Sequence, residues 1–222
     1  MKPVINHLWN LELDEAESLQ RNLAKKISLK PAFKFSDLKT IAGCDVSYKN
    51  NKVSASLVIF KFPELTLIKQ YKIVKEYKNI FEYVSGFLAF REGPIILELL
   101  ESVDFEPDVI IFDGQGIAHP RGIGIASHIG VLFDISTIGC AKNFLFGKYI
   151  EPENYKGAKS YLFNFSNEII GVVLRTKENV KPIFISPGNK INVELSFEII
   201  LNCCRNYRLP EPLRISHIFS KL

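Results

Sequence analysis

Three carboxylates stand at positions where they could support metal-dependent chemistry. Asp45 lies inside an apolar, strand-like run, Asp113 directly follows another such run, and Glu92 stands just ahead of a predicted helix. A charged side chain within an apolar strand needs a partner, and strand ends are common ligand positions. Mg²⁺ accepts one or two carboxylates and completes its octahedron with water and phosphate oxygens. The set is therefore compatible with a Mg²⁺ site that acts on phosphate groups.

Each carboxylate also has an ordinary structural interpretation. Asp45 could pair with a buried Arg or Lys, Glu92 could stabilise a helix terminus, and Asp113 could cap a turn. Without the sequence around them, these structural interpretations are the more common ones. The decision therefore rests on the neighbouring residues.

Those neighbouring residues resemble the endonuclease V family. The central match is the run Asp113-Gly114-Gln115-Gly116-Ile117-Ala118-His119-Pro120-Arg121-Gly122-Ile123-Gly124-Ile125-Ala126-Ser127-His128. Further matches, in the same order and spacing, are residues 42–48, 90–94, 139–143, 174–176, 186–188, 207–212 and 214–217. The resemblance therefore covers essentially the whole chain.

The resemblance implies a fold and a catalytic centre. The fold would be α/β (α+β) and ribonuclease-H-like, with a central mixed β-sheet flanked by helices. Asp45 and Asp113 would bind Mg²⁺ directly, with Mn²⁺ as a substitute, and Glu92 would act nearby through metal-bound water. Lys142 and His217 would neutralise phosphate charge and help to orient water or the leaving group. A surface lysine and a capping histidine are the ordinary alternatives for the last two.

The resemblance also implies a pocket for a base flipped out of the nucleic acid. The residues expected to form it, largely with their main chain, are Gly86, Leu88, Gly114 and Ile125. His119 matches a position near the bound base, and Tyr83 would fill the gap that the base leaves. Flipping a mispaired base costs less than flipping a paired one, which supplies part of the selectivity. The glycines alone would equally suit a tight loop. His128, in the helix expected after the loop, is interpreted as structural.

Two stretches depart from the family pattern. Where relatives carry a Pro-Tyr-Ile-Pro wedge, this chain has Glu82-Tyr83-Val84-Ser85, so we expect a more flexible loop with an added negative charge. After Gly188 this chain has Asn189 where relatives often place a basic residue. We expect that change to weaken one phosphate contact.

The function implied is a nick at the second phosphodiester bond 3′ to a deaminated base, chiefly hypoxanthine, in DNA. The substrate expected is DNA containing deaminated bases, and RNA containing inosine is an alternative partner because nothing in the sequence reports contacts to a 2′-hydroxyl. A catalytically silent nucleic-acid-binding module and an unrelated metal-dependent phosphatase are further alternatives. Retention of all three carboxylates argues against the silent module.

Hydrophobic periodicity predicts the elements that must position these residues. Helical spacing occurs at 13–27, 93–103 and 193–204, and a helix is expected to end near Phe133. Strands are expected at 40–48, 53–60 and 65–74, as an antiparallel set, and then at 109–112, 137–141, 171–175 and 182–186. Strands first and βα units afterwards predict one mixed sheet.

Bulk composition sets only broad limits. A length of 222 residues suits a single domain spanning 1–222, and a net charge of +4 permits a polyanionic partner without identifying one. The four cysteines lack metal-type spacing and are expected to be buried thiols. The sequence shows neither a secretory signal nor a membrane-spanning run, so a cytoplasmic location is expected.

Overall fold

An eight-stranded mixed sheet runs through the computed structural model, which describes residues 1–76 and 81–222. Its strand order is β3-β2-β1-β4-β5-β8-β7-β6. β1, β4 and β5 run parallel, whereas the other neighbouring pairs are antiparallel. The strands are β1 (Thr40–Lys49), β2 (Lys52–Lys61), β3 (Thr66–Glu76), β4 (Val109–Phe112), β5 (Thr137–Ala141), β6 (Lys159–Phe163), β7 (Ile169–Leu174) and β8 (Ile183–Asn189).

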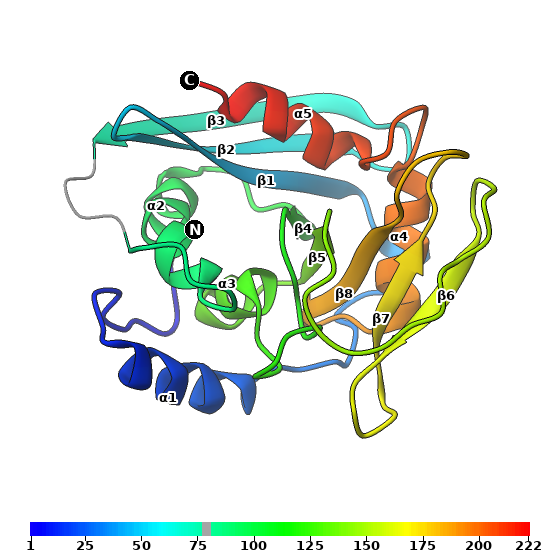
Figure 1. Ribbon diagram of the computed structural model, residues 1–222. Coiled ribbons are helices and arrows are strands. Elements are labelled where there is room, and N and C mark those ends of the chain that lie inside the picture. Colours follow the sequence, from blue (N-terminus) through cyan, green and yellow to red (C-terminus); the bar gives the residue numbers. More distant parts are fainter. Residues whose placement is uncertain (77–80) are drawn as a thin grey trace.

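Helices cover both faces of the sheet (Figure 1). The α-helices of the described residues are α1 (Leu13–Ala24), α2 (Leu88–Ser102), α3 (Ile125–Phe133), α4 (Val193–Cys203) and α5 (Glu211–Ser220). α2 and α3 pack on one face, where Leu99 and Ile129 join the core. α4 and α5 pack on the other, with Ile199 and Leu213. This mixed sheet with helices on both faces confirms the predicted ribonuclease-H-like class.

The central strands explain the unbroken apolar runs. Every residue of β4 and β5 is buried, because helices lie against both of their faces. Residues 41–45 of β1 are buried as well, and its alternate residues Gly43, Asp45 and Ser47 face α5. A Cβ on Gly43 would lie 2.1 Å from the carbonyl oxygen of Pro212, and the Ser47 hydroxyl donates to the carbonyl of Ser220 at 2.6 Å. The three residues therefore share one face of β1, as the alternation of side chains along a strand requires.

The start of α2 differs from the expectation. The helix begins at Leu88 rather than near Pro94, so Pro94 lies in its interior and Glu92 lies in its second turn. Ala89 and Phe90 are buried, and Phe90 packs in a small cluster with Ala16 of α1. This burial stabilises an extra turn, although proline cannot donate to the carbonyl four residues earlier. Glu92 is therefore held by a helix and is not at its mouth.

Two elements were not expected from periodicity. One is β6, which is a partly exposed edge strand, and the other is α5, which has Pro210 as its N-cap residue and Pro212 in its first turn. Proline is well tolerated in the first turn of a helix, so these prolines start α5 rather than prevent it. The helix matters because it carries His217.

The structure also shows the state of the four cysteines and the length and polarity of the helices. Cys44, Cys140, Cys203 and Cys204 are free and buried, as expected. Among the helices in the described part of the chain, none combines the length and apolarity needed to cross a membrane.

Candidate active site

Strand register brings the two aspartates together. In the parallel pairing of β1 with β4, Cys44 stands opposite Phe112, so Asp45 within β1 and Asp113 just after β4 lie side by side. His217 approaches from α5, and one potential ligand atom from each of Asp45, Asp113 and His217 lies within 4.8 Å of the others. Asp45 and His217, which are 172 positions apart in the chain, thus lie close together in the fold.

Asp45 is almost completely buried, with 5% of its surface exposed. The Ser220 hydroxyl donates to its Oδ2 at 2.6 Å, and Nδ1 of His217 lies 3.3 Å from the same oxygen. Burial raises the pKa of Asp45, and the nearby Asp113 raises it further, while the hydrogen bond from Ser220 opposes both effects. The charged form of Asp45 therefore depends on its polar partners.

Glu92 approaches the aspartates from α2. The three carboxylates Asp45, Glu92 and Asp113 line one small cavity of about 40 Å³. Burial raises the pKa of Glu92 well above its usual value, and repulsion from Asp45 and then Asp113 adds to the effect. A cation in the cavity would relieve this repulsion, and hard oxygen donors are the ligands that Mg²⁺ prefers. The residues present therefore fit a divalent cation.

Lys142 supplies a positive charge beside the carboxylates. It follows the last residue of β5, and its Nζ forms a short ion pair with Oδ2 of Asp113. Its carbonyl accepts from Nη2 of Arg208 at 2.6 Å, and the same guanidinium donates to the carbonyls of Lys181 and Pro182. Arg208 thus ties the segment leading to α5 to the strand end that carries Lys142.

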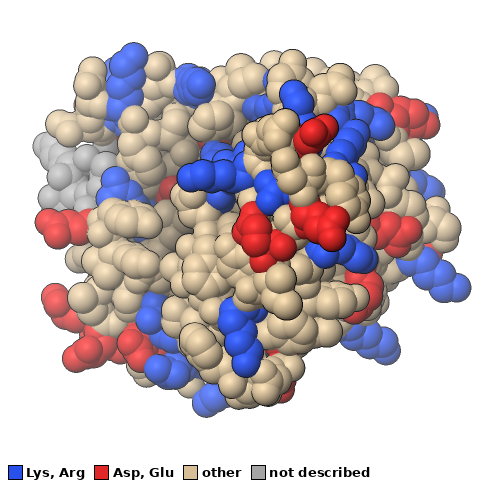
Figure 2. Space-filling model, turned by 45° about the vertical axis from the view of Figure 1, so that its right-hand side comes forward, with Lys and Arg blue, Asp and Glu red and all other residues tan. Residues whose placement is uncertain are grey.

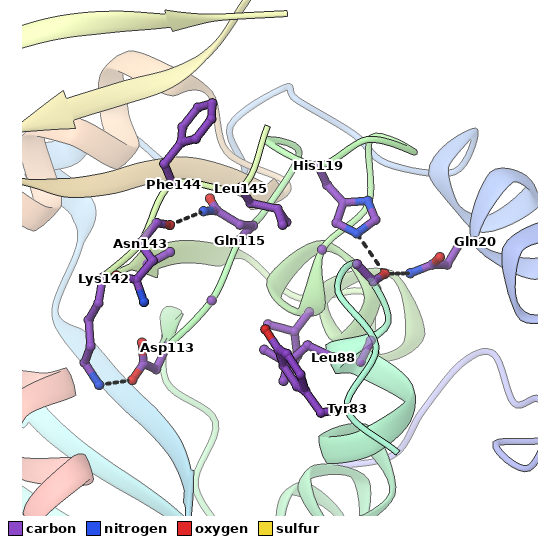
Figure 3. A pocket seen from close by; sticks show the side chains of 16 residues that line it. Gln20, Tyr83, Leu88, Asp113, Gln115, His119, Lys142, Asn143, Phe144 and Leu145 are labelled. Carbon is purple, nitrogen blue, oxygen red and sulfur yellow. Dashed lines mark hydrogen bonds and ion pairs between the residues drawn. The ribbon is translucent and has the colours of Figure 1, made fainter. Parts of the chain in front are cut away.

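A larger pocket, of about 320 Å³, adjoins the carboxylates. Its lining includes every residue predicted to bind the flipped base: Tyr83, Gly86, Leu88, Gly114, His119 and Ile125. Asp113 and Lys142 line it as well, so the pocket and the acidic site share two residues. Figure 3 shows Lys142 and Asp113 at one end of the pocket and His119 and Gln20 at the other. The ring of Tyr83 is 70% exposed.

Comparisons with known proteins decide the family. A family model for endonuclease V matches residues 21–218. The endonuclease V of Dictyoglomus thermophilum is 46% identical over 211 residues, which are 95% of this chain and 90% of that protein. The chain belongs to the endonuclease V family.

Solved endonuclease V structures share the fold. That of Bacillus subtilis superposes with a TM-score of 0.91 at 31% identity, covering 99% of this chain and 95% of the other. The Ciona intestinalis enzyme, solved with a 24mer DNA containing an inosine followed by a ribo-adenosine, gives a TM-score of 0.83 at 28% identity. That comparison covers 94% of this chain and 95% of the other. The likeness therefore extends over nearly the whole of each chain.

Several contacts that the structure shows were not predicted from the sequence. Ser220 bonds to Asp45, Arg208 holds the end of β5, and Gln20 lines the pocket although α1 was predicted only as a packing helix. Each is a common polar residue whose partner lies far away in the chain. Gln20 carried a weak signal in the sequence, because it stands four residues after Ala16 and three before Leu23 and so falls on the buried face of α1, where it is 1% exposed.

Two further expectations for this endonuclease V can be compared with the structure. His128 is buried and shares a hydrogen bond with His7, at 2.7 Å between their Nε2 atoms, so its structural role is confirmed. The expectation of a weakened phosphate contact at Asn189 stays a prediction. Asn189 is 2% exposed, accepts from the Ser28 amide, and donates to the carbonyls of Gly130 and Ile135. It joins the end of α3 to β8.

The charge on the displayed face of the protein does not by itself locate the active site. Figure 2 shows Lys and Arg side chains spread over the displayed face, with Asp and Glu side chains among them. This mixture agrees with the small net charge of +4. The site is therefore identified by its local geometry rather than by a broad basic surface.

Proposed function

We propose that this protein is a Mg²⁺-dependent endonuclease that nicks DNA at the second phosphodiester bond 3′ to a deaminated base, chiefly hypoxanthine. The observation that carries the proposal is that Asp113 lines both the acidic cavity and the adjoining pocket, and that its ion-pair partner Lys142 also lines the pocket. A base held in the pocket would keep its own strand close to the carboxylates. The products would carry 3′-hydroxyl and 5′-phosphate ends, and the base would stay in the nicked strand for later steps of DNA repair.

The roles proposed for the catalytic residues are those that the family resemblance implies, and the surroundings of these residues support them. Asp45 and Asp113 would hold Mg²⁺, which when bound polarises the phosphate and activates water, and Mn²⁺ would substitute. Glu92, in the same cavity, would accept hydrogen bonds from water beside the phosphate. The ammonium of Lys142 would offset phosphate charge, and the imidazole of His217 would orient the leaving group by a hydrogen bond.

The pocket residues would select the base. Main chain at Gly86, Leu88, Gly114 and Ile125 would surround a flipped purine, and a tight fit would favour a base whose pairing is already weak. Tyr83 would stack in the vacated position, because its exposed ring is free to contact bases. Base–aromatic stacking typically contributes roughly 1–3 kcal/mol per base.

Inosine in RNA is the second candidate substrate. The Ciona intestinalis protein was solved with an inosine followed by a ribo-adenosine, which supplies a 2′-hydroxyl next to the lesion. A protein can distinguish RNA from DNA at such a position through contacts to that hydroxyl. The two candidates differ in substrate and share the same chemistry.

Single-turnover nicking of an end-labelled duplex with one inosine tests the proposal. The wild type is assayed with Mg²⁺, Mn²⁺ or EDTA, alongside the matched RNA. We expect a metal-dependent cut at the second bond 3′ to inosine, abolished in Asp113→Asn. Asp134→Asn is the matched control, because Asp134 also pairs with a lysine, Lys190, away from the site. Binding without cleavage would favour a silent module, and neither binding nor cleavage would refute the proposed function.

A further inference from the structure

The main-chain carbonyl of Gly86 accepts hydrogen bonds from three side chains at once. Nε2 of Gln20 lies 3.0 Å away, Nε2 of His119 lies 2.9 Å away, and Nη2 of Arg121 lies 2.6 Å away. A carbonyl oxygen has two lone pairs, so these donors leave it no capacity for another partner. Gly86 is therefore fixed from α1 and from the loop that follows β4.

The three donors are also fixed relative to one another. The main-chain amide of Arg121 donates to Nδ1 of His119 at 3.1 Å, so the ring carries its proton on Nε2 and donates it to Gly86. Burial lowers the pKa of His119 to about 4, which keeps this ring neutral at neutral pH. Nε of Arg121 donates to Oε1 of Gln20 at 2.5 Å. Both ends of the Gln20 amide are thus engaged.

The backbone conformation at position 86 favours glycine. Its φ is +83°, in the left-handed region, and a Cβ there would lie 2.8 Å from Nη2 of Arg121. The guanidinium of Arg121 also lies over the ring of the next residue, Phe87, at 4.1 Å. The clamp therefore fixes the chain at Gly86 and Phe87, immediately before α2 begins at Leu88.

The segment around the clamp contributes much of the pocket. Tyr83, Gly86 and Leu88 all line it, as do Gln20 and His119, and Figure 3 shows the Gln20 and His119 side chains converging on one carbonyl. None of the hydrogen bonds of the clamp reaches Asp45, Glu92 or Asp113. The clamp can therefore affect where a base lies without directly touching the groups proposed to cut.

We propose that Gln20 and Arg121, together with neutral His119, are positioning residues that set the shape of the base pocket and the reach of Tyr83. This inference rests on the proposed function, in which the pocket receives a base. It also assigns His119 a role through Gly86 rather than a contact with the base. The Gly86 carbonyl is not an acceptor for the base, because its lone pairs are occupied.

The expected effect on the preference for inosine can be sized from the sensitivity of such sites to small displacements. A displacement of about 1 Å in a positioning element can cost up to about a hundredfold in rate. Gln20→Leu keeps a side chain of similar volume but removes both hydrogen bonds of the amide. We expect it to reduce the preference for inosine-containing duplex over undamaged duplex by about tenfold.

The control variant must show whether a change in preference comes from a displaced pocket or from a general loss of protein stability. Leu23 lies one turn after Gln20 on α1, is 3% exposed and belongs to the main core, but does not line the pocket. Leu23→Ala should lower stability and leave the preference for inosine within twofold of the wild type. Arg121→Lys keeps the charge but loses the forked donor geometry, so it should behave like Gln20→Leu.

The experiment is a fluorescence titration of each protein in EDTA with two duplexes that differ only in one inosine. Loss of preference in Gln20→Leu and Arg121→Lys, but not in Leu23→Ala, supports the inference. An unchanged preference in Gln20→Leu, or an equal loss in Leu23→Ala, overturns it while the proposed function stands. No preference in the wild type would instead refute the proposed base pocket, and the inference with it.

Discussion

Ser220, the last residue of α5, donates a hydrogen bond of 2.6 Å to Oδ2 of Asp45 on β1, 175 positions earlier in the chain. The bond lies in the interior of the protein and joins the C-terminal helix to a predicted metal ligand. Partners of this kind orient the ligand and stabilise its charged form. The C-terminal helix therefore contributes to the acidic site through more than His217.

Removal of this hydroxyl tests the contribution. Ser220→Ala should raise the Mg²⁺ concentration needed for half-maximal nicking by roughly tenfold to a hundredfold. The reason is that the hydrogen bond opposes the burial that disfavours the charged form of Asp45. Ser216→Ala is the matched control, because Ser216 lies on the same helix and bonds to Ser56 instead. Equal metal requirements in the wild type and Ser220→Ala would contradict the prediction.

Glu92 should be needed for nicking, although it lowers the stability of the metal-free protein. Its pKa is raised by burial and by Asp45 and Asp113, so its charged form is disfavoured in the folded protein. A carboxyl group whose pKa is higher in the folded protein than in the unfolded one contributes stability that is fully present below the unfolded-state pKa. This contribution is lost as the pH rises through the folded-state pKa.

The corresponding variant is Glu92→Gln. Without metal, it should resist urea better than the wild type at pH 8, and the two unfolding curves should converge near pH 4, where the carboxyl is protonated. Nicking should nevertheless fall by about a hundredfold or more. A wild type more stable than Glu92→Gln at pH 8 in EDTA would show that the proposed repulsion is absent.

Buried histidines should make the fold sensitive to acid. Burial lowers the pKa of His128 to about 3 and that of His119 to about 4. A depressed histidine pKa means that stability is full above the unfolded value of about 6.5 and falls with pH towards the folded value. Each such group should therefore lower the free energy of unfolding by about 1.4 kcal/mol per pH unit across that window.

Urea unfolding between pH 7 and pH 4 measures this dependence. His128→Leu should be less stable than the wild type at pH 7, because it loses the bond to His7, but its stability should fall less steeply with pH. His217→Leu is a useful comparison, since His217 is partly exposed, whereas His128 is fully buried. Parallel curves for the wild type and His128→Leu would exclude His128 as a source of acid sensitivity.

Two prolines should improve the wedge around Tyr83. Glu82→Pro combined with Ser85→Pro restores two fixed φ angles and removes an exposed negative charge, so less freedom is lost on binding. We expect binding to lesion-containing duplex to tighten by roughly threefold to tenfold in a titration. Glu82→Ala separates the effect of charge from that of rigidity. Unchanged or weaker affinity of the double variant would count against a flexibility cost.

Local sequence patterns were sufficient for much of the framework. The apolar runs at 109–112 and 137–141 predicted strands, and every residue of β4 and β5 is buried because helices cover both faces of these strands. Residue types and spacing, through the family resemblance, also indicated Asp45, Glu92, Asp113, Lys142 and His217. The placement of these residues in one site then required the parallel register of β1 and β4.

Where helices start and which distant polar groups meet was decided by tertiary structure. α2 begins before Pro94 because Phe90 packs against α1, and that contact outweighs the local preference against an interior proline. The bond from Ser220 to Asp45 and the clamp of Gln20 on Gly86 join residues far apart in sequence. No local pattern encodes such pairs, because each exists only after burial removes water as the competing hydrogen-bond partner.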